Sequence, residues 1–263
     1  MKRKFLVIAA FLFASFADAQ VTLPVGKKIQ LVTTQKLTNT TSAMGQDVEI
    51  LINGTTTTAA EVKLVDNKSV TFSATIKKIT GSFSGMGQEQ KFDSDDKDVA
   101  NNPMIAPMLK SLNKSEDVVI SLDKKSTANN NSPVNMENSL ALTMQDILLP
   151  NEAEGKAELF KWTSEYTSKE GAKSATIYTI TKLTSSEVEI TVNETANIIG
   201  NVQQMGMDVK QNLTGSKTSV LLYDASTKLL KASAQKFDFS GTMEVMGMNA
   251  PMKISGTVTT TVQ

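Results

Sequence analysis

Residues 70–77 read Val-Thr-Phe-Ser-Ala-Thr-Ile-Lys, with an apolar side chain at every second position. This alternation is typical of a strand that buries one face and exposes the other to water. Val188, Ile190 and Val192 alternate with polar residues in the same way. The many threonines and valines elsewhere also suit a half-buried pleated surface. The sequence therefore predicts a mainly β fold.

The region around these strands occurs twice. Residues 29–58 align without gaps onto residues 190–219, with eight identical pairs. The pairs are Ile29/Ile190, Thr34/Thr195, Met44/Met205, Gly45/Gly206, Asp47/Asp208, Val48/Val209, Gly54/Gly215 and Thr57/Thr218. A second block repeats Gly81, Met86 and Gly87 as Gly241, Met246 and Gly247. Methionines, aspartates and paired glycines recur at the same spacings in both segments, which predicts an internal duplication.

Turn signals divide each copy into strands of about fifteen residues. They fall at Met44-Gly45, Asp66-Asn67-Lys68 and Met86-Gly87, and again at Met205-Gly206, Asp224–Thr227 and Met246-Gly247. Successive turns of an antiparallel meander alternate between its ends, so the four Met-Gly hairpin tips should share one end. Gly54 and Gly215, isolated within their strands, are expected to be bends or bulges. The predicted architecture is a large, curved antiparallel sheet built as a long-strand meander with two similar halves.

The N-terminus has the layout of an export signal. Lys2, Arg3 and Lys4 precede an apolar run over residues 5–16, and Ala17-Asp18-Ala19 supplies the small residues of a cleavage site. The run is shorter than the roughly 20 residues that span a bilayer, and no cysteine is present to carry a lipid. We expect residues 1–19 to be a signal peptide and residues 20–263 to form one β-rich domain. The mature protein is expected in the bacterial periplasm or outside the cell, and not as a lipoprotein.

Composition excludes several kinds of site. The chain has no histidine and no cysteine, and Arg3 is its only arginine. Catalysis by Ser–His or Cys–His pairs and histidine-ligated metals are therefore excluded. Cleavage of the signal removes more basic than acidic residues and leaves a slight negative charge, which argues against nucleic acid as a partner. The missing arginine is also what an A/T-rich genome would produce.

An insert at about residues 96–160 separates the copies, which lie at about 29–95 and 190–263. Asn102-Pro103 is a helix start, and Pro107 predicts a short or kinked helix. The apolar face of this helix consists of Met104, Ile105, Met108, Leu109 and Leu112. We expect it to cover the concave face of the sheet and any ligand held there. Thr143–Leu149 is expected to form a further turn or two of helix before Pro150, and Val118, Ile120 and Leu122 alternate like a strand.

This layout, a long curved antiparallel sheet covered by short helices in an exported protein, resembles the lipoprotein-carrier superfamily typified by LolA and LppX. The Phe92-Asp93-Ser94 step with its following helix, and Leu148-Leu149-Pro150, are similar to a secreted family common in Bacteroidota. The chain departs from the carriers in its repeat, and from that family in the position of Trp162. The resemblance implies no catalytic residues.

Three groups of residues have both a functional and a structural interpretation. Residues 93–98 contain four aspartates, which can begin a calcium loop or form a solvated acidic turn. The Met-Gly tips can bind Cu(I) through thioethers, contact a partner through an adaptable apolar surface, or simply pack. Paired carboxylates can hydrolyse glycosides, but the acidic residues here mostly occupy outward strand positions.

These patterns favour an exported, non-enzymatic protein without a metal or cofactor. Its most favoured role is to bind an apolar ligand, such as a lipid or acyl chain, or a segment of an envelope protein on a concave sheet. The alternative is an extracytoplasmic scaffold or interaction protein with no small ligand. A carrier encloses an apolar cavity, whereas a scaffold packs solid. No membrane-spanning segment is expected after signal cleavage.

Overall fold

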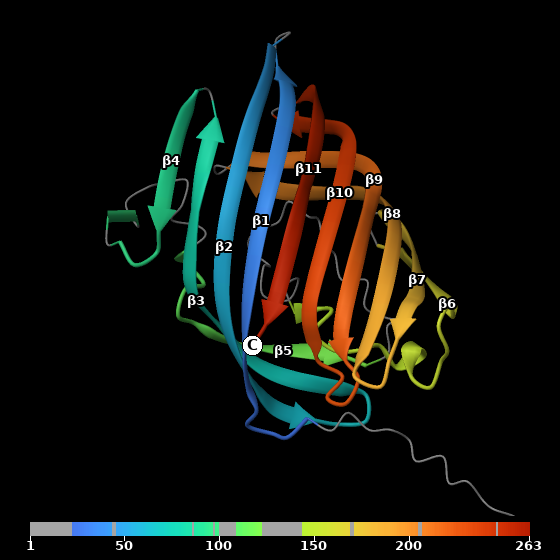
Figure 1. The fold of residues 1–263 in the computed structure, drawn as a ribbon. Helices are drawn as coiled ribbons and strands as arrows, with labels where there is room; N and C mark the ends of the chain where they lie inside the picture. Colours follow the sequence, from blue (N-terminus) through green and yellow to red (C-terminus); the bar gives the residue numbers. More distant parts are fainter. Residues whose placement is uncertain are drawn as a thin grey trace, which may run out of the picture.

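The computed structural model describes residues 23–43, 46–85, 87–96, 98–99, 109–122, 144–168, 171–204, 207–245 and 247–263. Within these residues eleven strands form one open antiparallel sheet, which confirms the predicted fold class (Figure 1). The strands are β1 (Lys28–Ala43), β2 (Gln46–Val65), β3 (Ser69–Gly85), β4 (Gln88–Asp93), β5 (Ser115–Ser121), β6 (Lys161–Thr167), β7 (Lys173–Leu183), β8 (Glu187–Gln204), β9 (Met207–Asp224), β10 (Leu230–Val245) and β11 (Met248–Val262). A short 3-10 helix, η4 (Asn151–Ala153), follows Pro150.

The strand order is β4-β3-β2-β1-β11-β10-β9-β8-β7-β6, and β5 pairs separately with β3. Consecutive strands are neighbours in most of the sheet, as a meander requires. The exceptions are β5, which pairs with β3, and the central pair, where β1 lies beside β11. Gln30 and Gln263 exchange two backbone hydrogen bonds of 2.9 Å there. The first and last strands of the chain are therefore neighbours in the middle of the sheet.

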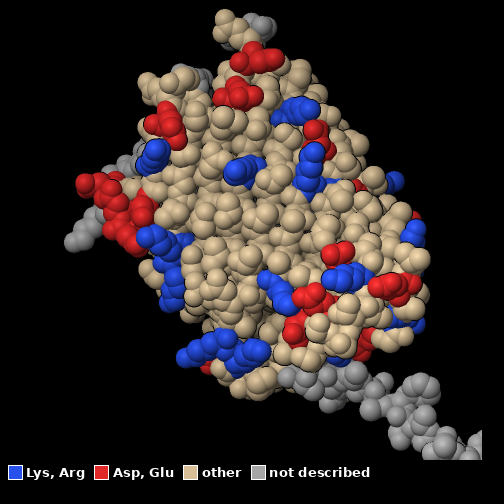
Figure 2. Space-filling view, in the orientation of Figure 1, with Lys and Arg blue, Asp and Glu red and all other residues tan. Residues whose placement is uncertain are grey.

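Alternation along the strands separates an inner, concave face from an outer face. In β2, β3 and β11 most side chains that point inward are buried or half-buried, and most of those between them are exposed or half-buried. The outer face is rich in threonine and serine, with long rows such as Thr34, Thr55 and Thr259 paired across three strands. Figure 2 shows this face with a broad uncharged centre and most lysine and acidic side chains nearer its margins.

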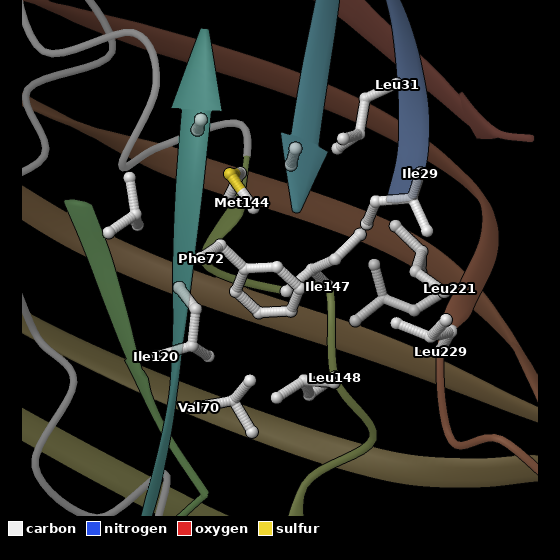
Figure 3. Packing of buried hydrophobic residues seen from close by; sticks show 14 of the residues in the cluster. Ile29, Leu31, Val70, Phe72, Ile120, Met144, Ile147, Leu148, Leu221 and Leu229 are labelled. Carbon is white, nitrogen blue, oxygen red and sulfur yellow. The ribbon is translucent and has the colours of Figure 1, made fainter. Parts of the chain in front are cut away.

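The main hydrophobic core lies where the sheet curls around β5 and the segment before η4. Phe72 of β3, together with Ile147 and Leu148 of the insert, converges with Leu221 and Leu229 from β9 and the β9–β10 turn (Figure 3). Phe72 and Ile147 are completely buried. The insert is therefore part of the core and not only a cover over it.

The β1–β2, β3–β4, β8–β9 and β10–β11 hairpins turn at one end of the sheet, which we call the Met-Gly end. A second, smaller core lies on the same inner face, closer to this end. It consists of Leu213, Phe237, Phe239, Met252 and Ile254. The ends of β8 and β9 beside it bend and pass behind the central strands (Figure 1). The sheet thus curls at this end as well.

Glycines permit this curling because they let adjacent backbones approach. A Cβ atom on Gly241 would lie 2.0 Å from a backbone oxygen of the neighbouring strand, and one on Gly215 would lie 2.1 Å from another. The same holds for Gly81 at 2.2 Å and Gly256 at 2.5 Å. All four point inward, where any side chain would meet the next strand. Glycine is therefore required at these positions of the sheet.

The expectation of a bulge at Gly54 and Gly215 is wrong, and the two glycines are not equivalent in their close contacts. Strand pairing is regular at both glycines, and a Cβ on Gly54 would come no closer than 3.3 Å, to the Gln35 side chain. The bulges lie elsewhere, for example between Thr57 and Thr58. The close approach in the first half occurs at Gly81, because its neighbour across the pair is itself a glycine and the strands can draw together there.

The described part of the insert agrees with expectation in part. The turn predicted before Pro150 forms at residues 144–147, where the Ile147 N–H donates to the Met144 carbonyl. Leu148 then makes a strand-like bridge to Leu229, because the hydrogen bonds of this segment go to the β9–β10 turn. The strand predicted at Val118, Ile120 and Leu122 is confirmed as β5, which ends at Ser121. The helix start at Asn102-Pro103 lies outside the described residues.

The two halves follow the same sequence of strands and turns. Residues 29–58 lie in the β1–β2 hairpin and residues 190–219 in the β8–β9 hairpin. Gly87 and Gly247 occupy the same tip position, with φ values of 77° and 80° that favour glycine. The halves diverge at their last strands, since β4 has 6 residues and β11 has 15. Duplication as the origin of this layout stays a prediction.

The turns at the other end of the sheet each depend on one aspartate. Asp66 accepts hydrogen bonds from the backbone N–H groups of Lys68 and Ser69, both at 2.7 Å. Asp224 accepts from Ser226 and Thr227 in the corresponding turn. The Ser226 hydroxyl and the Thr227 backbone N–H are the main donors that lower the pKa of Asp224 to about 2.

We expect Asp224→Asn to lower Tm at pH 7 by roughly 2–4 °C, for a loss of about 1 kcal/mol of hydrogen-bond energy. Because folding lowers this pKa from 3.8, the ionised carboxylate stabilises the protein above pH 4 and loses that effect as pH falls through about 2. The difference in Tm between variant and wild type should therefore shrink between pH 4 and pH 2. Thermal melts across this range test the prediction.

Glu116→Gln, at an exposed position of β5, is the control and should change Tm little at any pH. A difference in Tm between Asp224→Asn and wild type that stays constant from pH 4 to pH 2 would contradict the role assigned to the ionised carboxylate.

Candidate functional site

The candidate site is an apolar surface on the inner face of β1, β2 and β3, which we call the concave patch. Its residues are Leu37, Val48, Ile50, Ile52 and Phe83. Ile52 pairs in register with both Leu37 and Phe83, so the three side chains form one row across three strands. All five are only half-buried, in contrast to the fully buried residues of the main core. The patch is therefore inward-facing apolar surface that the described residues do not completely cover.

The patch lies toward the Met-Gly end of the sheet, whereas the insert fills the opposite end. Leu109 and Leu112, two of the predicted cover residues, are partly buried against the main core. Leu112 forms a bridge to Ile76 of β3. The other predicted cover residues, Met104, Ile105 and Met108, lie outside the described residues, and a ligand-covering role for the five stays a prediction.

The hairpin tips lie at the same end of the sheet as the concave patch. Gly87 and Gly247 have no atom within 4 Å of the position a Cβ would take, and Met248, next to Gly247, is 64% exposed. The remaining predicted tip residues, Met44, Gly45, Met86, Met205, Gly206 and Met246, lie outside the described residues. Apolar surface thus reaches the tip of the β10–β11 hairpin.

One ion pair crosses the inner face. Glu194 of β8 and Lys217 of β9 approach to 2.7 Å, with exposed side-chain fractions of 22% and 24%. Each neutralises the other, so this pair offers no free charge to an ionic ligand. Burial also raises the pKa of Tyr178 and of Tyr223, on the same face. Both phenols are therefore neutral near pH 7 and cannot act as bases.

The acidic segment after β4 is a turn with its own counter-charge. Lys78 lies 3.2 Å from Asp93 and 2.5 Å from Asp95. The Asp95 backbone N–H is the main cause of the lowered pKa of Asp93, and Asp95 is the main cause of the raised pKa of Lys78. Among the described residues no group of three or more acidic side chains is arranged to hold a metal ion. The geometry here is that of a solvated acidic turn with a lysine partner.

Sequence reasoning missed Gln211. This residue is only 2% exposed on the inner face of β9, and neither atom of its side-chain amide has a hydrogen-bond partner. A signal was present in the sequence. By strand alternation Gln211 points to the same face as Val209 and Leu213, and both of these are apolar. A polar residue in such a place indicates a special role or a cost.

Comparison with known proteins leaves the family open. No family model matches this chain, and neither does any curated protein. Among solved structures, the chain is similar to part of lipovitellin, in a structure titled for lipid–protein interactions, with 9% identity, 91% of this chain covered and a TM-score of 0.46. The chain spans 25% of that lipovitellin chain. An outer membrane channel from Pseudomonas putida F1 is 11% identical over 94% of this chain and 98% of its own, with a TM-score of 0.38.

The translocator domain of the autotransporter NalP from Neisseria meningitidis is similar over 93% of this chain and 91% of its own, at 9% identity and a TM-score of 0.21. All these proteins are at most distantly similar to this sheet, and their scores support no argument about function. In the described part of the chain, no helix is both long and apolar enough to cross a membrane.

Proposed function

We propose that this chain is an exported, non-enzymatic protein that binds an apolar ligand, such as a lipid acyl chain, on its concave face. The observation that carries the proposal is the concave patch, whose five apolar side chains point inward yet stay half-buried. The insert that was expected to cover this face packs, in its described part, against the main core. The described residues therefore leave inward-facing apolar surface uncovered near the Met-Gly end.

The energetics are sufficient for modest affinity. An acyl chain that covers roughly 300 Å² of apolar surface gains about 7 kcal/mol at ~25 cal/mol per Å². The costs of association remove about half or more of this. Dissociation constants in the millimolar to micromolar range follow for a chain held by apolar contacts alone.

The test is displacement of a fluorescent fatty acid from delipidated protein, with two adjacent substitutions on β2. Ile52→Asp places a carboxylate in the concave patch and should weaken binding at least about tenfold, because the charge must be desolvated when the chain binds. Leu51→Asp is the matched control. Leu51 is the preceding residue, points to the outer face and is 38% exposed, so its substitution should leave affinity unchanged.

Two results would contradict the proposal. The first is equal loss of binding in both variants at equal Tm, which would move the site off the concave face. The second is no binding of any acyl ligand at hundreds of micromolar. That result would favour a scaffold protein, for which the solid packing around Phe72 and Ile147 would then be the relevant feature.

A further inference from the structure

Among the described residues, Gln211 is the side chain in which two buried polar atoms lack a hydrogen-bond partner. It is 2% exposed, and both Nε2 and Oε1 lack partners. An unsatisfied buried polar group costs about 1–3 kcal/mol, and folded proteins retain few of them. A group that is costly to the free protein is explained if a ligand supplies the missing hydrogen bonds.

The surroundings of Gln211 leave room on one side. Across the strand pairs its neighbours are Met243 of β10 and Gly200 of β8. A Cβ on Gly200 would find no atom within 4 Å, so the position across the strand pair from Gln211 is open. Along β9 the flanking inward side chains are Val209 and Leu213, with exposed fractions of 1% and 0%. The amide is thus a polar group flanked by apolar side chains, and the residue across the strand pair leaves its side-chain position unfilled.

The charges around this position are already paired. Lys210 and Glu244 lie on the outer face and approach to 3.5 Å. The nearest inward-facing cation on β9 is Lys217, which is bound to Glu194 and lies about 20 Å along the strand at ~3.3 Å per residue. Among the described residues, an ionised head group beside Gln211 would meet no unpaired opposite charge and would pay its full cost of desolvation.

We propose that Gln211 anchors the uncharged polar head of an acyl-chain ligand. The amide N–H donates to a carbonyl or hydroxyl oxygen of the head, and the amide oxygen accepts from a hydroxyl or amide hydrogen. The ligand class is therefore a neutral-headed chain, such as a fatty alcohol, a fatty amide or a monoacylglycerol, in preference to a fatty-acid anion. This inference rests on the proposed function and specifies its ligand.

The experiment compares four ligands of equal chain length by displacement of the fluorescent fatty acid: tetradecanol, tetradecanamide, tetradecanoate at pH 8 and tetradecyltrimethylammonium. Gln211→Met replaces the amide with an apolar side chain of similar size. It should weaken binding of the alcohol and the amide about tenfold, the effect of one or two lost hydrogen bonds. Binding of the two ionic ligands should change less than about twofold. Gln235→Met, a half-buried inward-facing glutamine on β10, is the control and should preserve the wild-type ranking.

The outcomes separate this inference from the proposed function. An unchanged ranking in Gln211→Met, or an equal loss for all four ligands, would overturn the anchor while acyl binding stands. A lowered Tm with an unchanged ranking would overturn it too and would assign the amide to an internal water, because the substitution would then remove hydrogen bonds that the free protein already makes. Wild-type protein that binds none of the four chains would overturn the proposed function and this inference together. Gln211→Met should fold, because it removes an unpaired buried amide.

Discussion

Gly241→Ala should destabilise the protein by about 3 kcal/mol, at the upper end of the range for overpacked sites. The added Cβ would lie 2.0 Å from the Asn212 carbonyl oxygen and 3.0 Å from the Leu213 Cα. Both are backbone atoms of the paired strand and cannot move away as a flexible side chain would. Relief requires the strands to separate where the sheet curls over the second core. For a domain of this size the expected fall in Tm is roughly 6–12 °C.

Gly200→Ala is the matched control for this prediction. Gly200 also lies inside a long strand, but no atom would come within 4 Å of its new Cβ. The substitution should change stability by no more than about 0.5–1 kcal/mol, and in the stabilising direction, because alanine loses less backbone entropy on folding. Urea unfolding monitored through Trp162 measures both variants. Equal stabilities for the two would show that the close approach at Gly241 does not limit the fold.

Phe72→Ala should cost about 3–5 kcal/mol. Phe72 is completely buried at the centre of the main core, where β3 meets the insert, and truncation of a buried phenylalanine leaves a cavity in this range. Because Ile147 and Leu148 pack there too (Figure 3), the cavity would also loosen the segment that joins the two halves of the chain. Proteolysis between β5 and η4 should therefore accelerate together with global unfolding.

The control is Val119→Ala on β5. Val119 lies between the inward-facing Val118 and Ile120 but is 63% exposed, so its truncation should change stability by less than about 0.5 kcal/mol. If Phe72→Ala were equally mild, the insert would be a loose cover. The inner face would then be far more open than its burial indicates.

The candidate site was only partly predictable. The sequence correctly indicates which side chains of a strand share a face, so Ile50 and Ile52 can be placed together and opposite to Leu51 from alternation alone. It does not indicate that these side chains stay half-buried while Phe72 and Ile76 are fully buried. That difference depends on where the insert packs, and Leu109 and Leu112 contact the main core. The importance of Gln211 likewise depends on its surroundings, because a glutamine becomes costly only when nothing nearby can pair with it.

The sequence by itself determined the strands, their two faces and their turns. Period-two alternation, the Met-Gly tips and the aspartates at 66 and 224 are local signals, and each acts through a few adjacent backbone groups. Only the tertiary structure decided that β1 pairs with β11, that residues 147–149 lie extended in the core, and that Gly81, Gly215, Gly241 and Gly256 are the points of close approach. These features arise from contacts between segments distant in the chain. Their energies depend on which strands become neighbours, and no local pattern encodes that choice.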